Sequence, residues 1–272
     1  AAAWEPRGGG AVAGTSPWGA MQGRKALKLE WGACDNDRYD SAEYRKALEK
    51  AAREPGKSVR NDGDVSAAWG KADEKHRVTA EYYLPHLAHA SMEPPSATVL
   101  MEEDGQCNIW ACVQDPQNAL DGVAKQLSID KAKIILQPLL LGGAFGRKSK
   151  ADFVTEAAII ANTMKGKPVK VVWTREDDIQ HDFYHAVSLE HLEAALGADG
   201  MPTSWLHRTV APTISSLFDP SAQGESPSEL GMGAINLPYQ VPNFRVETGS
   251  VPAMTRIGWF RSVYNIPHAF AT

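Results

Sequence analysis

The chain has 272 residues, with 43% hydrophobic and 22% charged side chains and a formal net charge of −5. This composition is typical of a globular protein with a sizeable core, and the negative charge disfavours a nucleic-acid binder, which usually carries a basic face. Only 3 cysteines are present, too few for a disulfide framework or for an iron–sulfur cluster, which needs about four thiolates.

Residues 1–60 are predicted to form the end of a small N-terminal α/β domain. The expected elements are irregular chain over residues 1–14, a helix that begins after Ser16, a strand over residues 27–31 and a helix from Ser41 that stops before Pro55. Ser16-Pro17 is a common helix start, and residues 27–31 alternate between apolar and polar side chains as strands do. Turn-forming residues crowd residues 54–66, which predicts a linker and a domain boundary there.

Residues 61–272 are predicted to be α+β, with mixed sheets and packed helices. The expected strands are residues 76–84, 97–101, 107–113, 133–141, 168–174, 187–196 and 203–210. The expected helices are residues 116–127 and 152–164, the second capped by Asp152. Turn sequences at residues 103–105 and 198–200 predict two hairpins. Since hairpins are not βαβ units, a dinucleotide-binding fold is disfavoured.

A glycine-rich loop follows the strand over residues 133–141 and precedes a helix. Its residues are Gly142, Gly143, Ala144, Phe145, Gly146, Arg147 and Lys148. Glycines let backbone N–H groups approach a phosphate or an oxo group closely, and a helix N-terminus adds favourable partial charge. The loop is therefore a candidate anion site, although a tight turn that needs positive φ would use the same residues. A nucleotide-binding P-loop is a weaker match, because Arg147 stands where that loop has its second glycine.

Several other polar residues are candidates for local structural roles. Gln114 could cap the helix that follows it. His89 and Glu93 have a helical spacing, but Pro94 follows and no other metal ligand is evident. A structural pair is therefore preferred over a metal site. Residues 176–178, three consecutive acids, are interpreted as a solvated turn rather than as acid–base catalysts, because no pattern predicts their desolvation.

Six segments resemble, in chain order, motifs of the molybdenum hydroxylases of the xanthine dehydrogenase family. They are residues 89–94 (H-x-x-[ML]-E-P), 113–117 (the S/T-Q turn), 142–148 (GGGFGGK), 173–181 (W-T-R-E-D-D-x-x-H), 239–243 (Y-x-[IV]-P-N) and 258–263 (G-W-W-R-S-V). The motifs at residues 173–181 and 258–263 are similar to those of the isoquinoline oxidoreductase and aldehyde dehydrogenase branch. The resemblance extends over residues 11–272.

The resemblance implies a partial molybdenum-cofactor-binding domain of the xanthine oxidase type, in which a pterin dithiolene holds the metal and no protein atom binds it directly. Gln114 would donate a hydrogen bond from its side-chain amide to an oxo ligand. Backbone N–H groups and the Phe145 ring would approach the metal centre from Gly142, Gly143, Ala144, Phe145, Gly146 and Arg147. Trp259, Phe260 and Arg261 would line the cofactor.

By the same resemblance, the chain is a fragment of the large subunit of an enzyme that hydroxylates aldehydes or N-heterocycles with oxygen from water. Ser149 stands where purine-oxidising relatives carry a substrate-binding glutamate, and Ala144 and Arg147 replace glycines, so a purine substrate is disfavoured. The family's general-base glutamate lies in a G-x-G-E segment that is expected outside this chain. No catalytic residue is therefore assigned here, and the isolated chain is expected to be inactive.

The implied cofactor is molybdopterin with molybdenum, in its cytosine dinucleotide form, and [2Fe-2S] clusters would lie on a partner subunit. The implied partners are the remaining C-terminal half of the large subunit, the [2Fe-2S] small subunit and, in some relatives, a cytochrome c subunit. Neither end of the chain resembles a natural terminus, so a longer protein is expected. Two alternatives stay open: a cofactor-free structural or assembly module of the same fold, and a nucleotide-binding protein.

Overall fold

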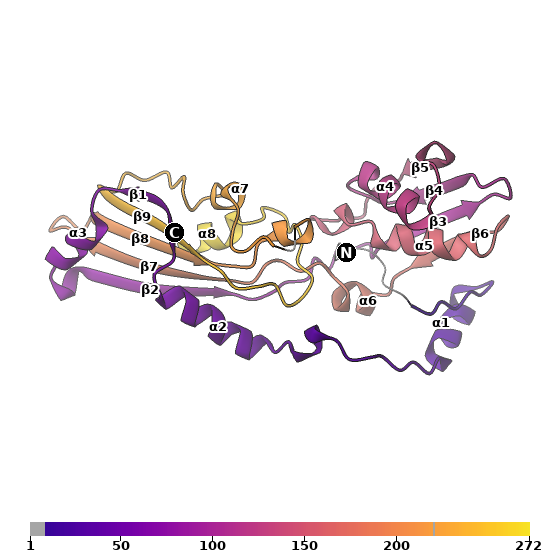
Figure 1. Cartoon of the computed structure of the whole chain (residues 1–272), viewed down its shortest axis with the longest axis horizontal. Helices are drawn as coiled ribbons and strands as arrows, with labels where there is room; N and C mark the ends of the chain where they lie inside the picture. The colour runs from indigo at the N-terminus through magenta and orange to yellow at the C-terminus, as the bar shows by residue number, and fades with distance from the viewer. Residues whose placement is uncertain (1–8, 220) are drawn as a thin grey trace. The chain divides into compact units, whose positions relative to one another are not determined.

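A computed structural model describes residues 9–219 and 221–272 (Figure 1). The described chain forms two compact units, each assembled from two separate stretches of sequence. Unit 1 contains residues 9–38 and 90–181, and unit 2 contains residues 39–89 and 182–272. Part of the N-terminal segment predicted to be irregular, its first eight residues, lies outside the described residues.

Unit 1 is built on a four-stranded mixed sheet with the strand order β5-β4-β3-β6. Its elements are α1 (Pro17–Ala26), β3 (Ser96–Met101), β4 (Cys107–Ala111), α4 (Pro116–Leu127), β5 (Ile134–Pro138), α5 (Asp152–Asn162), β6 (Pro168–Val172) and α6 (Arg175–Gln180). Strands β4 and β5 are parallel, and β3 is antiparallel to β4 and β6. Helices α4 and α5 pack together on this sheet (Figure 1) and enclose a core in which Val99, Ile109 and Phe153 are fully buried.

The junction between β4 and α4 is fixed by local sequence. The side chain of Asp115 accepts a hydrogen bond from the backbone N–H of Asn118, and Pro116 occupies the first turn of α4. At the other end of α4, Ser128 adopts a left-handed conformation with φ 54°. A capped start and a left-handed stop define the helix well, so Gln114 is held between the end of a central strand and a capped helix.

Unit 2 is built on a five-stranded sheet with the strand order β1-β9-β8-β7-β2. Its elements are α2 (Ser41–Arg53), β1 (Lys57–Asp62), α3 (Val65–Lys71), β2 (Arg77–Leu84), β7 (Ser188–Leu196), β8 (Pro202–Val210), α7 (Pro227–Leu230), β9 (Asn243–Gly249) and α8 (Asn265–Ala271). Strands β8 and β9 are parallel, and the other neighbouring strands are antiparallel. Tyr44, Leu48 and Ala52 of α2 are buried in one cluster with Leu189 and Val210 of the sheet.

The core of unit 2 also contains two buried carboxylate–imidazole pairs. Glu190 and His207 are joined at 2.8 Å across β7 and β8, and Glu225 and His268 are joined at 3.2 Å. Burial lowers the pKa of His268, but the bond to Glu225 and the nearby carboxylates outweigh it and raise that pKa to about 9. Pairing is what makes such groups tolerable in an apolar interior.

Several predicted elements are confirmed. The hairpin β3–β4 turns at Gly105, and the hairpin β7–β8 turns at Gly200; both glycines have positive φ. The helices expected from Ser41 and over residues 116–127 are α2 and α4. The mixed α+β architecture with packed helices is likewise confirmed.

Two N-terminal predictions are wrong. Residues 27–31 form no strand, because alternation alone gives no strand without a partner to hydrogen-bond, and within the described chain they pair with none. Residues 54–66 are not a linker: they contain β1, which pairs with β9 from far along the chain. Asn, Asp and Gly in this stretch sit at the end of β1 and in the turn to α3, so they mark a turn. The division into residues 1–60 and 61–272 stays a prediction.

The start of α5 also differs from expectation. Asp152 is the first residue of the helix rather than its cap, the cap position is Ala151, and no side chain caps this helix. The carboxylate of Asp152 instead binds the guanidinium of Arg147, with both oxygens 3.0 Å from nitrogen. A guanidinium that binds both carboxylate oxygens is a stronger partner for a buried carboxylate than one backbone N–H.

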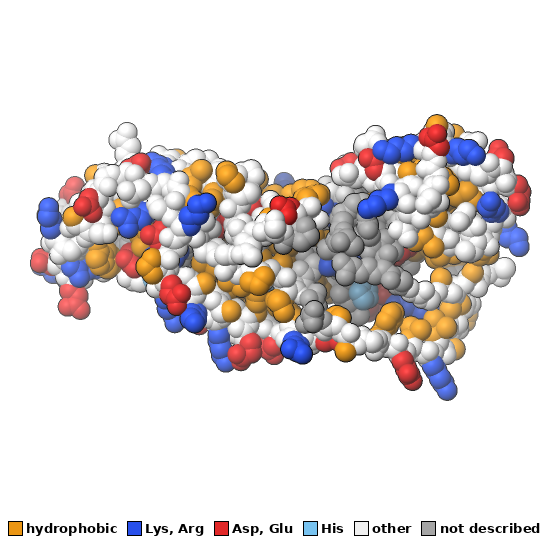
Figure 2. Space-filling view, viewed as in Figure 1, with side chains coloured by type: hydrophobic (Ala, Val, Ile, Leu, Met, Phe, Trp, Pro, Cys, Tyr) orange, Lys and Arg blue, Asp and Glu red, His pale blue; other side chains and the backbone are white. Residues whose placement is uncertain are grey.

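The surface carries both signs of charge. On the face drawn in Figure 2, Lys and Arg side chains are interspersed with Asp and Glu side chains. None of the helices in the described part of the chain combines the length and apolarity that crossing a bilayer would require.

Candidate functional site

The glycine-rich loop of unit 1 follows β5 after three exposed leucines, Leu139–Leu141. Its backbone is bent by positive φ at Gly143 (93°), Phe145 (56°) and Gly146 (115°). Residues 147–149 form a short 3-10 helix, and α5 begins only at Asp152. The loop therefore lies between β5 and α5 as expected, with the 3-10 helix at its end, and the donors of the loop are its own backbone N–H groups.

Three consecutive backbone N–H groups of the loop have no acceptor within the described chain. Gly142 donates to Glu93 Oε2 at 3.1 Å, Gly146 donates to Gln114 Oε1 at 3.0 Å, and the N–H of Arg147 donates to the Ala144 carbonyl at 2.9 Å. The N–H groups between them, those of residues 143–145, donate to no atom that the structure describes. The loop thus offers a short row of donors suited to an anion or an oxo group.

Gln114 is held against this loop in one orientation. Its backbone N–H donates to the Lys148 carbonyl at 3.0 Å, and its Oε1 accepts the N–H of Gly146. Since a backbone N–H can only donate, Oε1 must face Gly146 and Nε2 is left as a donor. The alternative that Gln114 caps α4 is wrong, because Asp115 does so.

The side chain of Arg147 is part of the fold. The residue is 1% exposed, its guanidinium binds both oxygens of Asp152, and its central carbon lies 5.0 Å from the centre of the Trp173 ring. This bidentate and stacked geometry is the one that suits a guanidinium best. Only the backbone of Arg147 therefore adjoins the loop surface.

The geometry also opposes the nucleotide-binding alternative. In a P-loop, the lysine and the serine after the last glycine contact phosphates and magnesium. Here the Lys148 side chain is fully buried and its Nζ donates to Glu93 at 2.5 Å. The hydroxyl of Ser149 donates to the Gly146 carbonyl at 2.6 Å. Neither side chain is left to contact a nucleotide.

His89 and Glu93 do not form the expected structural pair, because the chain between them is not helical and Ala90 has φ 44°. Glu93 binds within unit 1, whereas His89 binds within unit 2. Both ring nitrogens of His89 face oxygen atoms: Nδ1 lies 2.9 Å from Asp182 Oδ2, and Nε2 lies 2.8 Å from the Trp259 carbonyl. The buried ring therefore bridges the carboxylate of Asp182 and the backbone carbonyl of Trp259.

His89 thereby holds the motif segment of unit 2 that contains Trp259, Phe260 and Arg261. Its ring also stacks on Phe260, with centroids 4.8 Å apart. Trp259 stacks on Phe218 at 5.7 Å, and Arg261 is exposed.

The segment is followed by a strained turn. Ser262 and Val263 have φ 73° and 47°, a conformation that is unusual for any residue with a Cβ and most unusual for a β-branched one. Such outliers occur often at functional sites.

Comparison with known proteins decides the family. The profile of the molybdopterin cofactor-binding domain matches residues 50–272. The chain belongs to this family. Over 257 residues it is 30% identical to the membrane-bound aldehyde dehydrogenase [pyrroloquinoline-quinone] of Gluconacetobacter polyoxogenes, covering 90% of this chain and 32% of that protein. It is 25% identical to a subunit of the nicotinate dehydrogenase of Pseudomonas putida, covering 93% of this chain and 21% of that protein.

Solved structures share the fold of this molybdopterin cofactor-binding domain. Reconstituted CO dehydrogenase from Oligotropha carboxidovorans superposes with a TM-score of 0.65 at 16% identity, covering 93% of this chain and 34% of that one. Aldehyde oxidoreductase from Desulfovibrio gigas superposes with a TM-score of 0.61 at 21% identity, covering 80% and 23%. The chain thus spans about a third or less of the length of these relatives.

The acidic triplet of the domain is structural, but it is not a solvated turn. Residues 175–180 form α6, in which Asp177 and Asp178 are buried. Asp177 makes a capping box with Thr174 and binds the guanidinium of Arg24 at 2.5 and 2.6 Å. Asp178 pairs with Arg175 at 2.5 Å. No sequence pattern indicates this burial, because both partner arginines look like ordinary surface residues.

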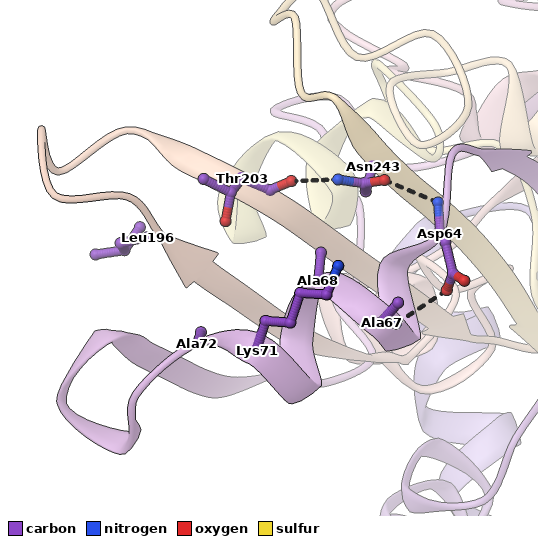
Figure 3. Close-up of a pocket in the computed structure, with 8 residues that line it drawn as sticks. All are labelled: Asp64, Ala67, Ala68, Lys71, Ala72, Leu196, Thr203 and Asn243. Atoms are coloured by element: carbon purple, nitrogen blue, oxygen red, sulfur yellow. Dashed lines mark hydrogen bonds between the residues drawn. The ribbon is translucent and has the colours of Figure 1, made fainter.

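One surface cavity of the domain is lined by both polar and apolar residues (Figure 3). It measures about 460 Å³ and lies beside α3 in unit 2. Asn243, from the Y-x-[IV]-P-N motif, donates to the Thr203 carbonyl at 2.9 Å and accepts the N–H of Asp64 at 2.8 Å, and Asp64 caps α3. This motif residue therefore ties β8 and β9 to α3 and needs no ligand to explain it.

The structure thus gathers part of the predicted site. Unit 1 joins Gln114 to the loop of residues 142–147, and unit 2 holds Trp259, Phe260 and Arg261 on one segment. Three residues support these segments in a way that was not predicted: Lys148, Asp182 and His89. His89 and Lys148 lie within recognised motifs, so their position was a usable signal, whereas nothing in the sequence around Asp182 marks it.

Proposed function

We propose that this chain supplies part of the cofactor-binding surface of a molybdenum hydroxylase that oxidises an aldehyde or an N-heterocycle. The hydrogen bond between Gln114 and Gly146 carries the proposal, because it leaves the amide donor of Gln114 next to a row of unpaired backbone donors. When bound, the molybdopterin cofactor supplies hydroxylation of an electrophilic carbon with oxygen derived from water. The role of these residues is to orient and hydrogen-bond the anionic end of that cofactor.

The loop fits a ligand that approaches the backbone closely. A Cβ added at Gly143 would lie 3.3 Å from the Phe145 ring and 3.5 Å from Ser91 Cβ, and the φ of 93° is one that L side chains rarely adopt. Phe145 is 43% exposed, and its backbone is left-handed. A bent, side-chain-poor backbone with unpaired donors is what an oxo group requires.

On unit 2, Trp259, Phe260 and Arg261 are proposed to line the same cofactor. The exposed guanidinium of Arg261 suits an anionic group of a pterin cofactor, since it offers several donors in one plane. The ring of His89 is proposed to fix the segment through the Trp259 carbonyl.

The substrate class rests on the names of relatives and on one residue. Relatives of the chain are named for aldehyde, nicotinate and isoquinoline oxidation. Ser149, where a purine-binding glutamate would stand, has its hydroxyl bonded to the Gly146 carbonyl, so it offers no carboxylate to a purine. A [2Fe-2S] subunit, a cytochrome c subunit and the C-terminal part of a large subunit are the proposed partners, and the cytosine dinucleotide is the proposed cofactor form.

The test is the cofactor content of the native protein, purified at its full natural length with its associated subunits. Stoichiometric molybdenum, an oxidised pterin fluorophore and cytidine monophosphate released by acid hydrolysis are the expected results. Reduction of an artificial dye should follow addition of an aldehyde or an N-heterocycle. A protein that carries neither molybdenum nor pterin would instead be a cofactor-free module, and the proposal would fail.

A further inference from the structure

One carboxylate of unit 1 binds both ends of the glycine-rich loop. Oε2 of Glu93 accepts the N–H of Gly142 at 3.1 Å and the ammonium of Lys148 at 2.5 Å. The backbone N–H of Glu93 also donates to the Gly142 carbonyl at 2.9 Å. Residue 142 begins the loop and residue 148 ends it, so the two ends are drawn to a single side chain.

The burial of Lys148 makes its pairing with Glu93 necessary for the fold. The side chain of Lys148 is fully buried, and within the described chain its ammonium bonds to Glu93 alone, whose side chain is 34% exposed. Desolvation raises the pKa of Glu93, but the bonds from Lys148, Gly142 and the Cys112 thiol outweigh it and lower that pKa overall. A buried ammonium without its carboxylate is strongly unfavourable. The ion pair therefore keeps the two ends of the loop together.

The bonds that Glu93 makes to Gly142 and Lys148, here called the clamp, are connected to Gln114, the proposed donor to the cofactor. The carbonyl of Lys148 accepts the N–H of Gln114 at 3.0 Å, and Gln114 Oε1 accepts the N–H of Gly146. Glu93, Lys148 and Gln114 therefore form a continuous set of bonds around the loop. Moving Lys148 would move the backbone of Gln114, and with it the amide donor.

We propose that Glu93 is a positioning residue: by binding Gly142 and Lys148 with one carboxylate, it fixes the curvature of residues 142–148 and the placement of Gln114 against the molybdenum cofactor. This inference rests on the proposed function. In this proposal, Glu93 contacts neither the cofactor nor the substrate. A merely stabilising ion pair would predict a loss of stability without a change at the loop.

Amide hydrogen exchange of the native full-length protein measures directly whether the loop amides are protected by these bonds. The double variant Glu93→Ala/Lys148→Met removes both partners, so no buried charge is left unpaired and the protein should fold. The amide of Gly142 should then exchange roughly ten- to a hundredfold faster, as expected for the loss of a bond to a charged group. The amide of Gln114 should also exchange faster, because the ion pair no longer holds its acceptor, the carbonyl of residue 148, in place. Lys148→Met alone should accelerate Gln114 and leave Gly142 protected by Glu93.

Glu102→Gln is the matched control, because Glu102 also lies in unit 1 and accepts a side-chain hydrogen bond, from Asn108 at 3.3 Å, away from the loop. It should leave the amides of Gly142 and Gln114 unchanged. Unchanged exchange at both amides in the double variant would overturn the clamp.

Cofactor content separates the clamp from the proposed function. The positioning role requires that the double variant retain several-fold less molybdenum and pterin than the wild type, while Glu102→Gln retains the wild-type amount. Fast exchange with undiminished cofactor would overturn the positioning role and leave the proposed function intact. A wild-type protein without cofactor would overturn the proposed function, and with it the positioning role, while exchange would still decide whether Glu93 closes the loop.

Discussion

At the scale of single residues, the orientation of Gln114 is decided by one neighbour. An amide side chain can rotate so that its oxygen and nitrogen exchange places, and both arrangements are otherwise similar in shape. The N–H of Gly146, 3.0 Å from Oε1, permits only one of them. The hydrogen bond from the loop thus fixes the orientation of the Gln114 amide and leaves Nε2 as the donor.

This orientation can be tested with two substitutions. Gln114→Glu keeps an acceptor for Gly146 but loses the donor, whereas Gln114→Ala loses both. Turnover of the native complex should fall about ten- to a hundredfold in each variant, because a bond to a charged group is worth roughly 1.5–3 kcal/mol. Only Gln114→Ala should also accelerate hydrogen exchange at Gly146. Undiminished kcat in both variants would rule out contact between Gln114 and the cofactor.

At the scale of elements, the turn after Arg261 stores backbone strain. Ser262 and Val263 are both left-handed, and the hydroxyl of Ser262 makes no hydrogen bond within the described chain. Position 262 is therefore constrained by its left-handed backbone conformation and not by a contact of its side-chain hydroxyl.

Ser262→Gly is expected to stabilise the protein. It removes a left-handed cost of roughly 1–2 kcal/mol and adds roughly 0.5–1 kcal/mol of backbone entropy cost, so the free energy of unfolding should rise by up to about 1.5 kcal/mol. Ser228→Gly, at an exposed helical position of α7, should lower it by roughly 0.5–1 kcal/mol. Denaturant unfolding measures both, and a destabilised Ser262→Gly variant would mean that the turn is not strained.

Helix α1 depends on a bond to α6. None of its residues is buried, yet Arg24 makes a two-pronged bond to Asp177. The hydrogen bond from Arg24 is the main reason why the pKa of Asp177 is lowered to about 2. A lowered carboxyl pKa contributes stability above the unfolded value of about 4 and loses it as pH falls from about 4 to about 2.

Arg24→Gln should therefore release α1. Pepsin should cleave residues 17–34 several-fold faster in the variant than in the wild type at pH near 4, and the difference should shrink as pH approaches about 2. Arg45→Gln, which removes a surface pair with Glu49 on α2, is the control and should not change this cleavage. Equal cleavage of Arg24→Gln and wild type at pH near 4 would show that other contacts hold α1.

At the scale of the whole molecule, the chain is expected to lack hydroxylase activity by itself. The family's general base is proposed to lie outside these 272 residues, and positioned proton transfer contributes about 10²–10⁴-fold to a rate. Adding the C-terminal part and an iron–sulfur subunit should restore molybdenum retention and dye reduction. Substantial substrate-dependent dye reduction by the isolated chain, verified by mass spectrometry, would place the base elsewhere.

Elements with local signals could be predicted from the amino-acid sequence. The hairpins at Gly105 and Gly200, the helix over residues 116–127 and the glycine-rich loop each depend on a few adjacent residues. The order of the motifs was enough to indicate the family, and with it Gln114 as a candidate.

Features that depend on distant partners were decided by folding. Residues 27–31 alternate but find no strand to pair with among the described residues, whereas the turn-like stretch around β1 finds β9. Nothing in the sequence marks a partner for Lys148, yet Glu93 pairs with it in a buried position. The physical reason is the same in each case. Burial and pairing depend on neighbours that folding brings together. The local sequence of a charged or alternating stretch does not indicate which distant group will pair with it.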